Sequence, residues 1–346
     1  KAGLELFLGS YPITPATDIM HELALRRDLG AKVVQCEDEI AGVTTTIGAA
    51  FAGCLAVTNT SGPGLALKSE GINLAVMAEL PIVIVDVMRS GPSTGMPTKT
   101  EQTDLLQALY GRNGESPLVV MAPGTPDDCF QYAYMASKIA LEYMTPVILL
   151  TDAFLGNGTS LWNLPKLADM PEIKPNYVQP GMEGCKVTFR NEETKVRYWA
   201  IPGTPGFEHR NGGLEKDYEK GSISTDGENH QKMVETRAQK VENVANSIPD
   251  ITTYGSDDAE LLVIGWGGTR GHLMSAVSDM NEKGEKIALA HFNYIKPLPK
   301  NTAELISKYK KVVVCELNNG QFATFLRSKV PGVNFLQYNK VQGQPF

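Results

Sequence analysis

The sequence predicts an α/β protein in which a doubly wound parallel sheet is followed by a smaller α/β domain. Short apolar runs alternate with segments of helical periodicity through residues 1–155, and the same alternation returns over residues 256–346. The stretch between them, residues 156–255, differs because prolines recur in it. Strands that alternate with helices along a chain favour a parallel sheet with helices on both faces.

The expected strands of the first half are apolar, β-branched runs at residues 4–9, 32–35, 54–58, 81–87, 118–121 and 146–151. Helices are expected at residues 63–77, 100–109 and 126–142. Thr14 before Pro15 predicts a helix start, and Gly30 its end, because a hydroxyl caps a helix and proline suits its first position. A further helix is expected from about Asp38. Its apolar face recurs at helical spacing through Ile40, Val43, Ile47 and Ala50.

The middle of the chain, residues 166–255, is expected to be an extended connection. Prolines stand at positions 165, 171, 175, 180, 202 and 205, and residues 206–229 are rich in glycine and charge. One amphipathic helix is predicted, with apolar residues at Val234, Ala238, Val241, Ala245 and Ile248. A connection of this length is usually functional or an interface arm.

The last part, residues 256–346, is expected to form the smaller domain, and residues 1–165 the larger one. Its expected strands span residues 259–264, 286–290 and 311–316, with helices at 272–283, 302–309 and 322–329. Residues 265–271 predict a tight glycine-rich turn. They hold only part of the dinucleotide-binding fingerprint, so an unrelated nucleotide-binding protein is the weaker alternative.

The composition excludes several classes of function. A formal charge of −7 without a basic tract argues against nucleic acid as a partner, and the apolar runs are too short to span a membrane. The cysteines are Cys36, Cys54, Cys129, Cys185 and Cys315, and no two lie closer than 18 residues. This spacing fits free thiols in the cytoplasm, so no metal or iron–sulfur site is expected from this chain alone.

Four segments with functional groups follow predicted strands, and they are expected to meet on one edge of the parallel sheet. They are residues 11–15, a helix start at Glu39, the turn 59–64 and the loop 89–98. The carboxyl ends of strands are where open α/β sheets bind ligands. Thr60 and Ser61 begin a turn whose free N–H groups suit an anion or a cofactor ring edge, and no P-loop lysine follows them.

An arginine and a glutamate are the residues of this edge most suited to chemistry. Arg89 can hold a carboxylate through two parallel hydrogen bonds, although a salt bridge within its loop is an equal alternative. Glu39 is the expected inward-facing carboxylate, although pairing with the helix dipole is the plainer explanation for an acid there. Further polar contacts are expected from Ser93, Thr94 and Thr98, and weaker ones from Lys99, Arg112 and Asn113.

Several long motifs resemble the alpha subunit of 2-oxoacid:ferredoxin oxidoreductases. They lie at residues 9–18, 37–41, 60–64 and 89–105, and shorter matches at 203–206, 212–215, 230–233, 316–321 and 342–346 extend the resemblance over essentially the whole chain. The loop from Arg89 resembles the 2-oxoglutarate branch more than the pyruvate branch. The family implies a thiamine diphosphate enzyme that converts 2-oxoglutarate, coenzyme A and oxidised ferredoxin reversibly to succinyl-CoA, CO2 and reduced ferredoxin.

The resemblance also implies roles for parts of the chain. Residues 1–165 would be a pyrimidine-binding-type thiamine diphosphate domain, and residues 256–346 a transketolase C-terminal-like domain. Glu39 would be the catalytic carboxylate that hydrogen-bonds the aminopyrimidine ring. The implied cofactor-binding residues are Pro12, Thr14, Glu39, Thr60, Ser61 and Arg89, and the implied substrate-binding residues are Thr14, Arg89 and Thr98.

The same resemblance implies that the chain acts only with partners. A beta subunit is expected to share thiamine diphosphate and to carry Mg²⁺ and a [4Fe–4S] centre, in a hetero-oligomer that uses ferredoxin and coenzyme A. A gamma domain is expected to be upstream, on a separate chain or absent. The alternatives are a pyruvate or branched-chain 2-oxo acid enzyme and a non-catalytic assembly subunit. The presence of Glu39 and Arg89 argues against the assembly subunit.

Overall fold

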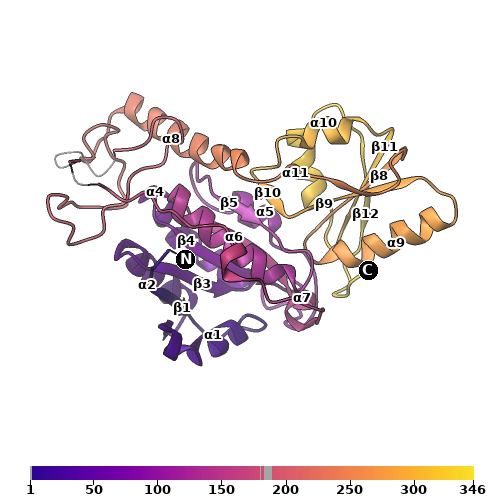
Figure 1. The fold of residues 1–346 in the computed structure, drawn as a ribbon, viewed down its shortest axis with the longest axis horizontal. Coiled ribbons are helices and arrows are strands. Elements are labelled where there is room, and N and C mark those ends of the chain that lie inside the picture. The colour runs from indigo at the N-terminus through magenta and orange to yellow at the C-terminus, as the bar shows by residue number, and fades with distance from the viewer. Residues whose placement is uncertain (1, 180, 183–188) are drawn as a thin grey trace.

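The first sheet has seven strands in the order β10-β5-β6-β4-β3-β1-β2 (Figure 1). The computed structural model describes residues 2–179, 181–182 and 189–346, so Pro180 and Cys185 lie outside the described residues. The strands are β1 (Leu6–Ser10), β2 (Lys32–Gln35), β3 (Leu55–Thr60), β4 (Ile82–Met88), β5 (Val119–Met121), β6 (Val147–Asp152) and β10 (Tyr294–Lys296). All pair in parallel except β10, which runs antiparallel to β5.

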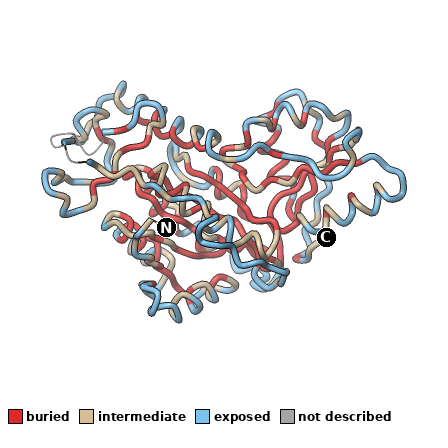
Figure 2. The backbone as a smooth tube through the Cα atoms, in the orientation of Figure 1, coloured by how far each residue is buried: buried red, intermediate tan, exposed pale blue. Residues whose placement is uncertain are grey.

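Helices cover both faces of this sheet. They are α1 (Thr17–Ala24), α2 (Glu39–Phe51), α3 (Gly62–Leu67), α4 (Ser69–Met77), α5 (Leu105–Tyr110), α6 (Asp128–Tyr143) and α7 (Ala153–Asn157). Along β4, Ile82 and Ile84 pack into the core that contains α2, α4 and α5, whereas Val83 faces α6 and α8 (Gly227–Glu242). Because both faces are covered, the central strands β4, β5 and β6 are almost entirely buried (Figure 2), whereas the edge strand β2 is largely exposed.

The second sheet has the order β12-β11-β8-β9-β7 and is parallel apart from β7. Its elements are β7 (Thr253–Gly255), β8 (Leu261–Trp266), α9 (Arg270–Glu282), β9 (Ile287–Phe292), α10 (Thr302–Ser307), β11 (Lys311–Glu316), α11 (Gln321–Lys329) and β12 (Phe335–Asn339). The two sheets lie side by side (Figure 1), and one apolar core continues from the first into the second through Trp266 and Phe322. The predicted α/β class is confirmed, while the three domain boundaries stay a prediction.

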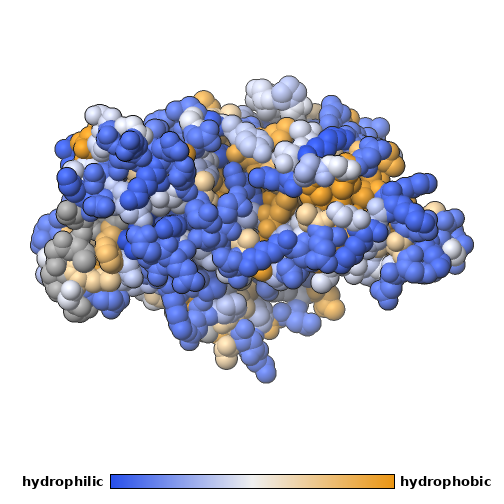
Figure 3. Space-filling view, turned by 90° about the horizontal axis from the view of Figure 1, so that it is seen from above, coloured by the Kyte–Doolittle hydropathy of each residue, from blue (hydrophilic) through white to orange (hydrophobic). Residues whose placement is uncertain are grey.

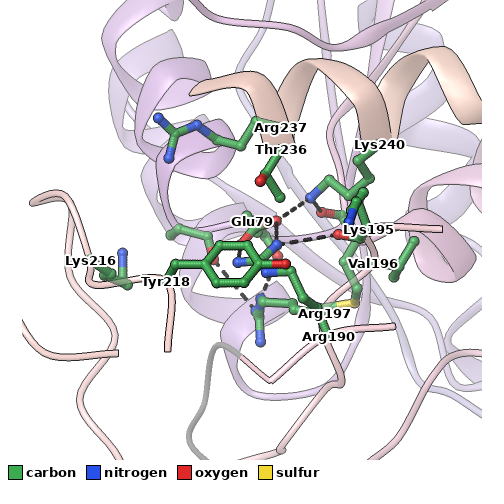
Figure 4. Close-up of polar contacts among 12 residues, drawn as sticks. Glu79, Arg190, Lys195, Val196, Arg197, Lys216, Tyr218, Thr236, Arg237 and Lys240 are labelled. Atoms are coloured by element: carbon green, nitrogen blue, oxygen red, sulfur yellow. Dashed lines mark hydrogen bonds and ion pairs between the residues drawn. The ribbon is translucent and has the colours of Figure 1, made fainter. Parts of the chain in front are cut away.

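A buried ion cluster anchors the long connection to the first sheet (Figure 4). Glu79, which follows α4, accepts hydrogen bonds from Arg190 at 3.0 and 3.1 Å and from Lys240 of α8 at 2.6 Å. Arg197 Nε donates to the Glu79 carbonyl at 3.2 Å. A helix is present as predicted, as α8, and it continues as a 3-10 helix over Asn243–Asn246. The predicted apolar face is wrong in part, because Ala238 is exposed and the buried face carries Arg237 and Lys240, whose charges are paired with Glu215 and Glu79.

The predicted helix start at Thr14 is wrong. The Thr14–Pro15 peptide bond is cis, and α1 begins at Thr17, whose hydroxyl accepts the N–H of Ile13 at 2.8 Å. Gly30, with a φ of 84°, ends a separate 3-10 helix rather than α1. The local turn therefore occupies the residues from which the cap was expected.

Two other helices also differ from their predictions. Residues 63–77 form α3 and α4, which meet at Lys68. The helix expected over 100–109 begins only at Leu105, because Gln102 bonds to the residue after β11: its N–H donates to the Leu317 carbonyl at 3.0 Å, and its side-chain oxygen accepts the Leu317 N–H at 2.9 Å. The elements β7, β10, β12 and α7 were not predicted from the sequence.

The surface and the thiols add two observations. No helix in the described ranges is long and apolar enough to cross a membrane. Seen from above, hydrophilic residues cover most of the molecule, and an apolar area lies on the half that carries the second sheet (Figure 3). The described cysteines, which are Cys36, Cys54, Cys129 and Cys315, are free thiols as expected.

Candidate active site

The segments after β1, β3 and β4 meet at the carboxyl edge of the first sheet. Arg89 Nη1 donates to the Thr14 carbonyl at 2.6 Å, which joins the loop after β4 to the loop after β1. The hydroxyls of Tyr11 and Thr60 lie 2.8 Å apart, which joins the end of β1 to the end of β3. The topology of parallel strands places these groups together, since neighbouring strands end at the same edge.

Arg89 is a buried guanidinium with unused hydrogen-bonding capacity. It is 7% exposed, and its Nε has no hydrogen-bond partner among the described residues. No carboxylate in the described ranges lies within ion-pair distance of it, although Asp104 attracts it from farther away. Thr103 Oγ1 donates to the Arg89 carbonyl at 3.0 Å and fixes the backbone. The salt bridge that the loop would need for a purely structural arginine is therefore not formed within these residues.

A cavity of about 680 Å³ opens beside Arg89. Its walls are α3, the loop after β4, residues 101–107 and residues 318–321, which connect β11 of the second sheet to α11. Ser93 lines this cavity, whereas Thr94 and Thr98 are exposed and do not. Because ligand sites in such folds lie at junctions of this kind, the cavity is the candidate binding groove.

Glu39 is the first residue of α2 and is half-buried. The preceding Asp38 caps the helix, since its Oδ1 accepts the N–H of Ala41 at 2.8 Å. The Glu39 carboxylate itself has no hydrogen bond or salt bridge to any described residue, so its oxygens are free to meet a ligand. Its carbonyl is held by the buried ammonium of Lys68 at 2.8 Å.

Thr60 and Ser61 are fully buried, and neither lines the groove. Thr60 bonds to Tyr11, while Ser61 Oγ has no partner among the described atoms. The turn that they open requires glycine, because a Cβ on Gly64 would lie 1.9 Å from the Tyr11 hydroxyl oxygen. Thr60 and Ser61 are therefore packed inside the protein behind this edge and do not line the groove.

The other predicted contacts lie outside the groove. Pro12, Thr14 and Lys99 are exposed on the edge. Arg112 bonds to the carbonyls of Ala108 and Ser116 and organises the loop after α5. Asn113 pairs with the side chain of Asn73, and neither Arg112 nor Asn113 lines the groove. Thr14 enters the site through its carbonyl, which accepts the bond from Arg89.

Sequence reasoning missed two buried features beneath this edge. One is Lys68, a lone cation at the joint between α3 and α4. The other is the pair of Asp86 in β4 and Asp104 before α5. Burial first, and then the neighbouring carboxyl, raises the pKa of Asp86 well above its usual range. An acid inside the apolar run 81–87 was the signal that could have identified it.

Asp86 and Asp104 are a neighbouring pair of buried acids. Neither oxygen of Asp86 has a hydrogen-bond partner among the described residues. Burial also raises the pKa of Asp104. Two neighbouring buried carboxyls repel each other when both are ionised, so the pair favours a state in which one of them is protonated.

Comparisons with known proteins fit this arrangement. A family model described as pyruvate flavodoxin/ferredoxin oxidoreductase, thiamine diphosphate-binding, matches residues 1–226. The 2-oxoglutarate oxidoreductase subunit KorA of Mycobacterium tuberculosis is 49% identical over 346 residues, which are 100% of this chain and 52% of that protein. The 2-oxoglutarate synthase subunit KorA of Methanothermobacter marburgensis is 33% identical over 93% of this chain and 85% of its own length. The chain thus spans about half the length of its mycobacterial relative.

Solved structures agree with the sequence relatives. The 2-oxoglutarate:ferredoxin oxidoreductase from Magnetococcus marinus, with 2-oxoglutarate, coenzyme A and succinyl-CoA bound, matches with a TM-score of 0.94 and 35% identity over 99% of this chain and 60% of that chain. A split-gene transketolase matches with a TM-score of 0.50 at 10% identity over 96% of this chain and 82% of that chain, which shows the fold alone. The chain therefore belongs to the 2-oxoacid:ferredoxin oxidoreductase family, as a chain of the alpha-subunit type that carries the family's thiamine diphosphate-binding domain.

Proposed function

We propose that this chain is the alpha subunit of a thiamine diphosphate-dependent 2-oxoglutarate:ferredoxin oxidoreductase. The reaction converts 2-oxoglutarate, coenzyme A and oxidised ferredoxin to succinyl-CoA, CO2 and reduced ferredoxin. The observation that carries the proposal is Arg89, a buried guanidinium with free donors and no acidic partner within ion-pair distance among the described residues. The names of the relatives, which are 2-oxoglutarate enzymes, support this substrate.

Glu39 fits a role at the aminopyrimidine ring of thiamine diphosphate. An aminopyrimidine ring needs a carboxylate at its ring nitrogen, and Glu39 is a half-buried carboxylate without a hydrogen bond to any described residue. Bound thiamine diphosphate supplies a thiazolium carbon that adds to a keto carbon and then acts as an electron sink. Glu39 would hold and exchange the proton at the ring nitrogen, which is general acid–base work suited to a positioned carboxylate.

Arg89 would bind and orient the substrate. Two parallel N–H donors of a guanidinium match the two oxygens of a carboxylate. The bond from Nη1 to the Thr14 carbonyl fixes the plane of the guanidinium before a substrate arrives. Holding the carboxylate in one orientation places the adjacent keto carbon for attack and lowers the entropic part of the barrier.

The remaining parts of the enzyme are assigned to partners. We infer that a beta subunit shares the cofactor, carries Mg²⁺ and a [4Fe–4S] centre and passes electrons to ferredoxin, in a cytoplasmic hetero-oligomer. The relatives support this because they are named as subunits. A gamma domain, upstream or on a separate chain, is part of the same proposal, as are substrate-binding roles for Thr14 and Thr98 and cofactor-binding roles for Pro12, Thr60 and Ser61.

The experiment that tests this function is anaerobic reconstitution. The chain is produced with its beta subunit, and coenzyme A-dependent reduction of ferredoxin or a viologen dye is followed with 2-oxoglutarate and with pyruvate. We expect 2-oxoglutarate to be the better substrate. A preference for pyruvate would keep the reaction type and assign pyruvate as the substrate. An inactive complex loaded with cofactor would favour a non-catalytic assembly subunit.

The variant Arg89→Met tests in the same assay whether Arg89 binds the substrate carboxylate. Loss of a charge-assisted bond costs about 1.5–3 kcal/mol, so the KM for the oxo acid should rise at least about tenfold. Arg327→Met is the matched control, because Arg327 donates to the Phe335 carbonyl in the second sheet, away from the groove. An unchanged KM in Arg89→Met would assign the substrate carboxylate to another residue.

A further inference from the structure

Lys68 has a fully buried ammonium at the joint between α3 and α4. Its Nζ donates to the Glu39 carbonyl at 2.8 Å and to Thr58 Oγ1 at 3.2 Å, and it lies 4.9 Å from the centre of the Tyr11 ring. These contacts join α2, β3 and the end of β1. No carboxylate of the described residues lies within ion-pair distance of it, so the charge is held by dipoles and a ring face.

Such an arrangement is expensive in free energy, because a buried ammonium without a paired anion loses its hydration. Burial lowers the pKa of Lys68 to about 8, although Glu39, Cys36 and Asp38 attract its charged form. Tyr11 and Thr58 face it from the other two elements and are neutral partners. A neutral residue would fill this core position at lower cost, so the charge calls for a functional reason.

Its surroundings indicate that reason. The ammonium contacts the backbone of Glu39 directly, and of the charged groups that attract it Glu39 has the largest effect. Tyr11, which Lys68 faces, is also bonded to Thr60 of the glycine-rich turn. Gly42 leaves room for the ammonium, since a Cβ there would lie 3.3 Å from Nζ.

We propose that Lys68 is a positioning residue for Glu39: its ammonium fixes the first residue of α2 and places a positive charge beside the Glu39 carboxylate. This inference rests on the proposed function, in which Glu39 meets the aminopyrimidine of the cofactor. Lys68 itself is enclosed by protein and acts on the cofactor only through Glu39.

The test compares Lys68→Met with Lys240→Met in the reconstituted complex. Both changes remove a fully or almost fully buried ammonium with little change in volume, and Lys240 lies in the Glu79 cluster, outside the site. Thiamine diphosphate affinity is measured by calorimetric titration, and kcat is measured from pH 6 to pH 10. Thermal unfolding of both variants reports the loss of stability that they have in common.

Lys68→Met should weaken thiamine diphosphate binding at least about tenfold and lower kcat at pH 7 by a similar factor, since a charge-assisted hydrogen bond is disturbed. Wild-type kcat should fall above about pH 8 as Lys68 loses its proton, and the variant should lack this fall. Lys240→Met should keep the wild-type affinity and pH profile. Equal losses in both variants with unchanged profiles, or wild-type affinity in Lys68→Met, would overturn the inference.

The two proposals fail in different ways. If the wild-type complex binds thiamine diphosphate and reduces no acceptor, the proposed reaction is wrong, and the calorimetric comparison still decides the role of Lys68. If the wild-type complex is active and Lys68→Met matches it in affinity and pH profile, the reaction stands and the positioning role is refuted.

Discussion

Replacing Glu79 with glutamine should destabilise the chain strongly. The Glu79 carboxylate is 3% exposed and receives Arg190 at both oxygens and Lys240 at one (Figure 4). The Arg197 side chain bonds to the carbonyl of the same residue. Glutamine preserves the volume and removes the charge, so the effect reports electrostatics and not a cavity.

The magnitude follows from the charges that remain. Glu79 is one carboxylate against three buried cations, and the variant leaves all three without an anion among these four residues. Breaking a buried ion pair from one side costs about 3–5 kcal/mol, because the partner charge stays buried and uncompensated. We expect a loss in this range for Glu79→Gln.

The loss should depend on pH in a defined direction. Burial alone would raise the pKa of Glu79, but the charges of Arg190, Lys240 and Arg197 hold it well below its usual range. A carboxyl whose folded pKa is depressed contributes stability above its unfolded pKa, near 4.5, and loses it as pH falls through the folded value. The difference between wild type and variant should therefore be full at pH 7 and shrink under acid conditions.

The pKa of Lys240 shifts downward, whereas the pKa of a lysine in an ordinary ion pair shifts upward. Burial and repulsion by two guanidinium groups lower the pKa of Lys240 to about 8, although Glu79 attracts its charged form. The carboxylate, which is surrounded by three cations, is the charge that the cluster holds most firmly. The cations therefore outnumber the carboxylate, and removing one of them should help a chain that has already lost Glu79.

Urea denaturation followed by tryptophan fluorescence measures these effects, since Trp199 is buried within the anchored connection. Glu260→Gln is the control, because it breaks an exposed pair with Lys310 and should change little. The double variant Glu79→Gln with Lys240→Met should recover part of the loss. A Glu79→Gln chain within about 1 kcal/mol of wild type, or a double variant less stable than the single one, would refute the reasoning.

Two further changes have expected signs of their own. Asp86→Asn should stabilise the chain at neutral and alkaline pH. Burial and Asp104 raise the folded pKa of Asp86, so the wild-type chain loses stability as pH rises from the unfolded pKa through the folded one, and the amide avoids this loss. The gain should vanish near pH 4 in melts taken from pH 4 to pH 9, and a lower midpoint than wild type at pH 8 would contradict it. Gln102→Ala should destabilise the contact between the sheets by about 1–3 kcal/mol, because it leaves the buried Leu317 N–H unpaired, whereas the Trp266 carbonyl keeps its bond from Thr269. Hydrogen exchange at Leu317 checks this, and unchanged protection there would oppose it.

Local patterns were sufficient for elements that satisfy their own hydrogen bonds and bury an apolar face. The strands at Lys32–Gln35 and Lys311–Glu316 were predicted with their observed bounds, and Asp38 was the expected start of a helix. The failures depend on distant partners. Residues 100–104 are not helical because Gln102 binds Leu317, 215 residues away, and β10 is a strand because β5 pairs with it.

The site was predictable to a similar degree. The rule that ligands meet the carboxyl ends of parallel strands predicted one edge for Glu39 and Arg89; Arg89 lines the groove, Glu39 does not, and their common site stays a prediction. It did not identify Lys68 or Asp86, because a charge within an apolar run is visible in sequence but its missing counter-ion is not. Only the fold shows that Lys68 has neutral partners and that Asp86 faces another acid.

Two buried carboxylates in this chain should respond oppositely to the same chemical change. At Glu79 the neighbours are cations, so conversion to an amide removes their stabilising partner. At Asp86 the neighbour is a second acid, so conversion to an amide relieves repulsion and desolvation. Asp86, Lys68 and Arg89 also have no oppositely charged partner within ion-pair distance among the described residues, and Arg89 lines the candidate groove together with Asp104, the neighbour of Asp86. Buried ionisable groups of this kind are costly to a fold, and their presence at this edge is the physical argument that the edge is built to meet a ligand.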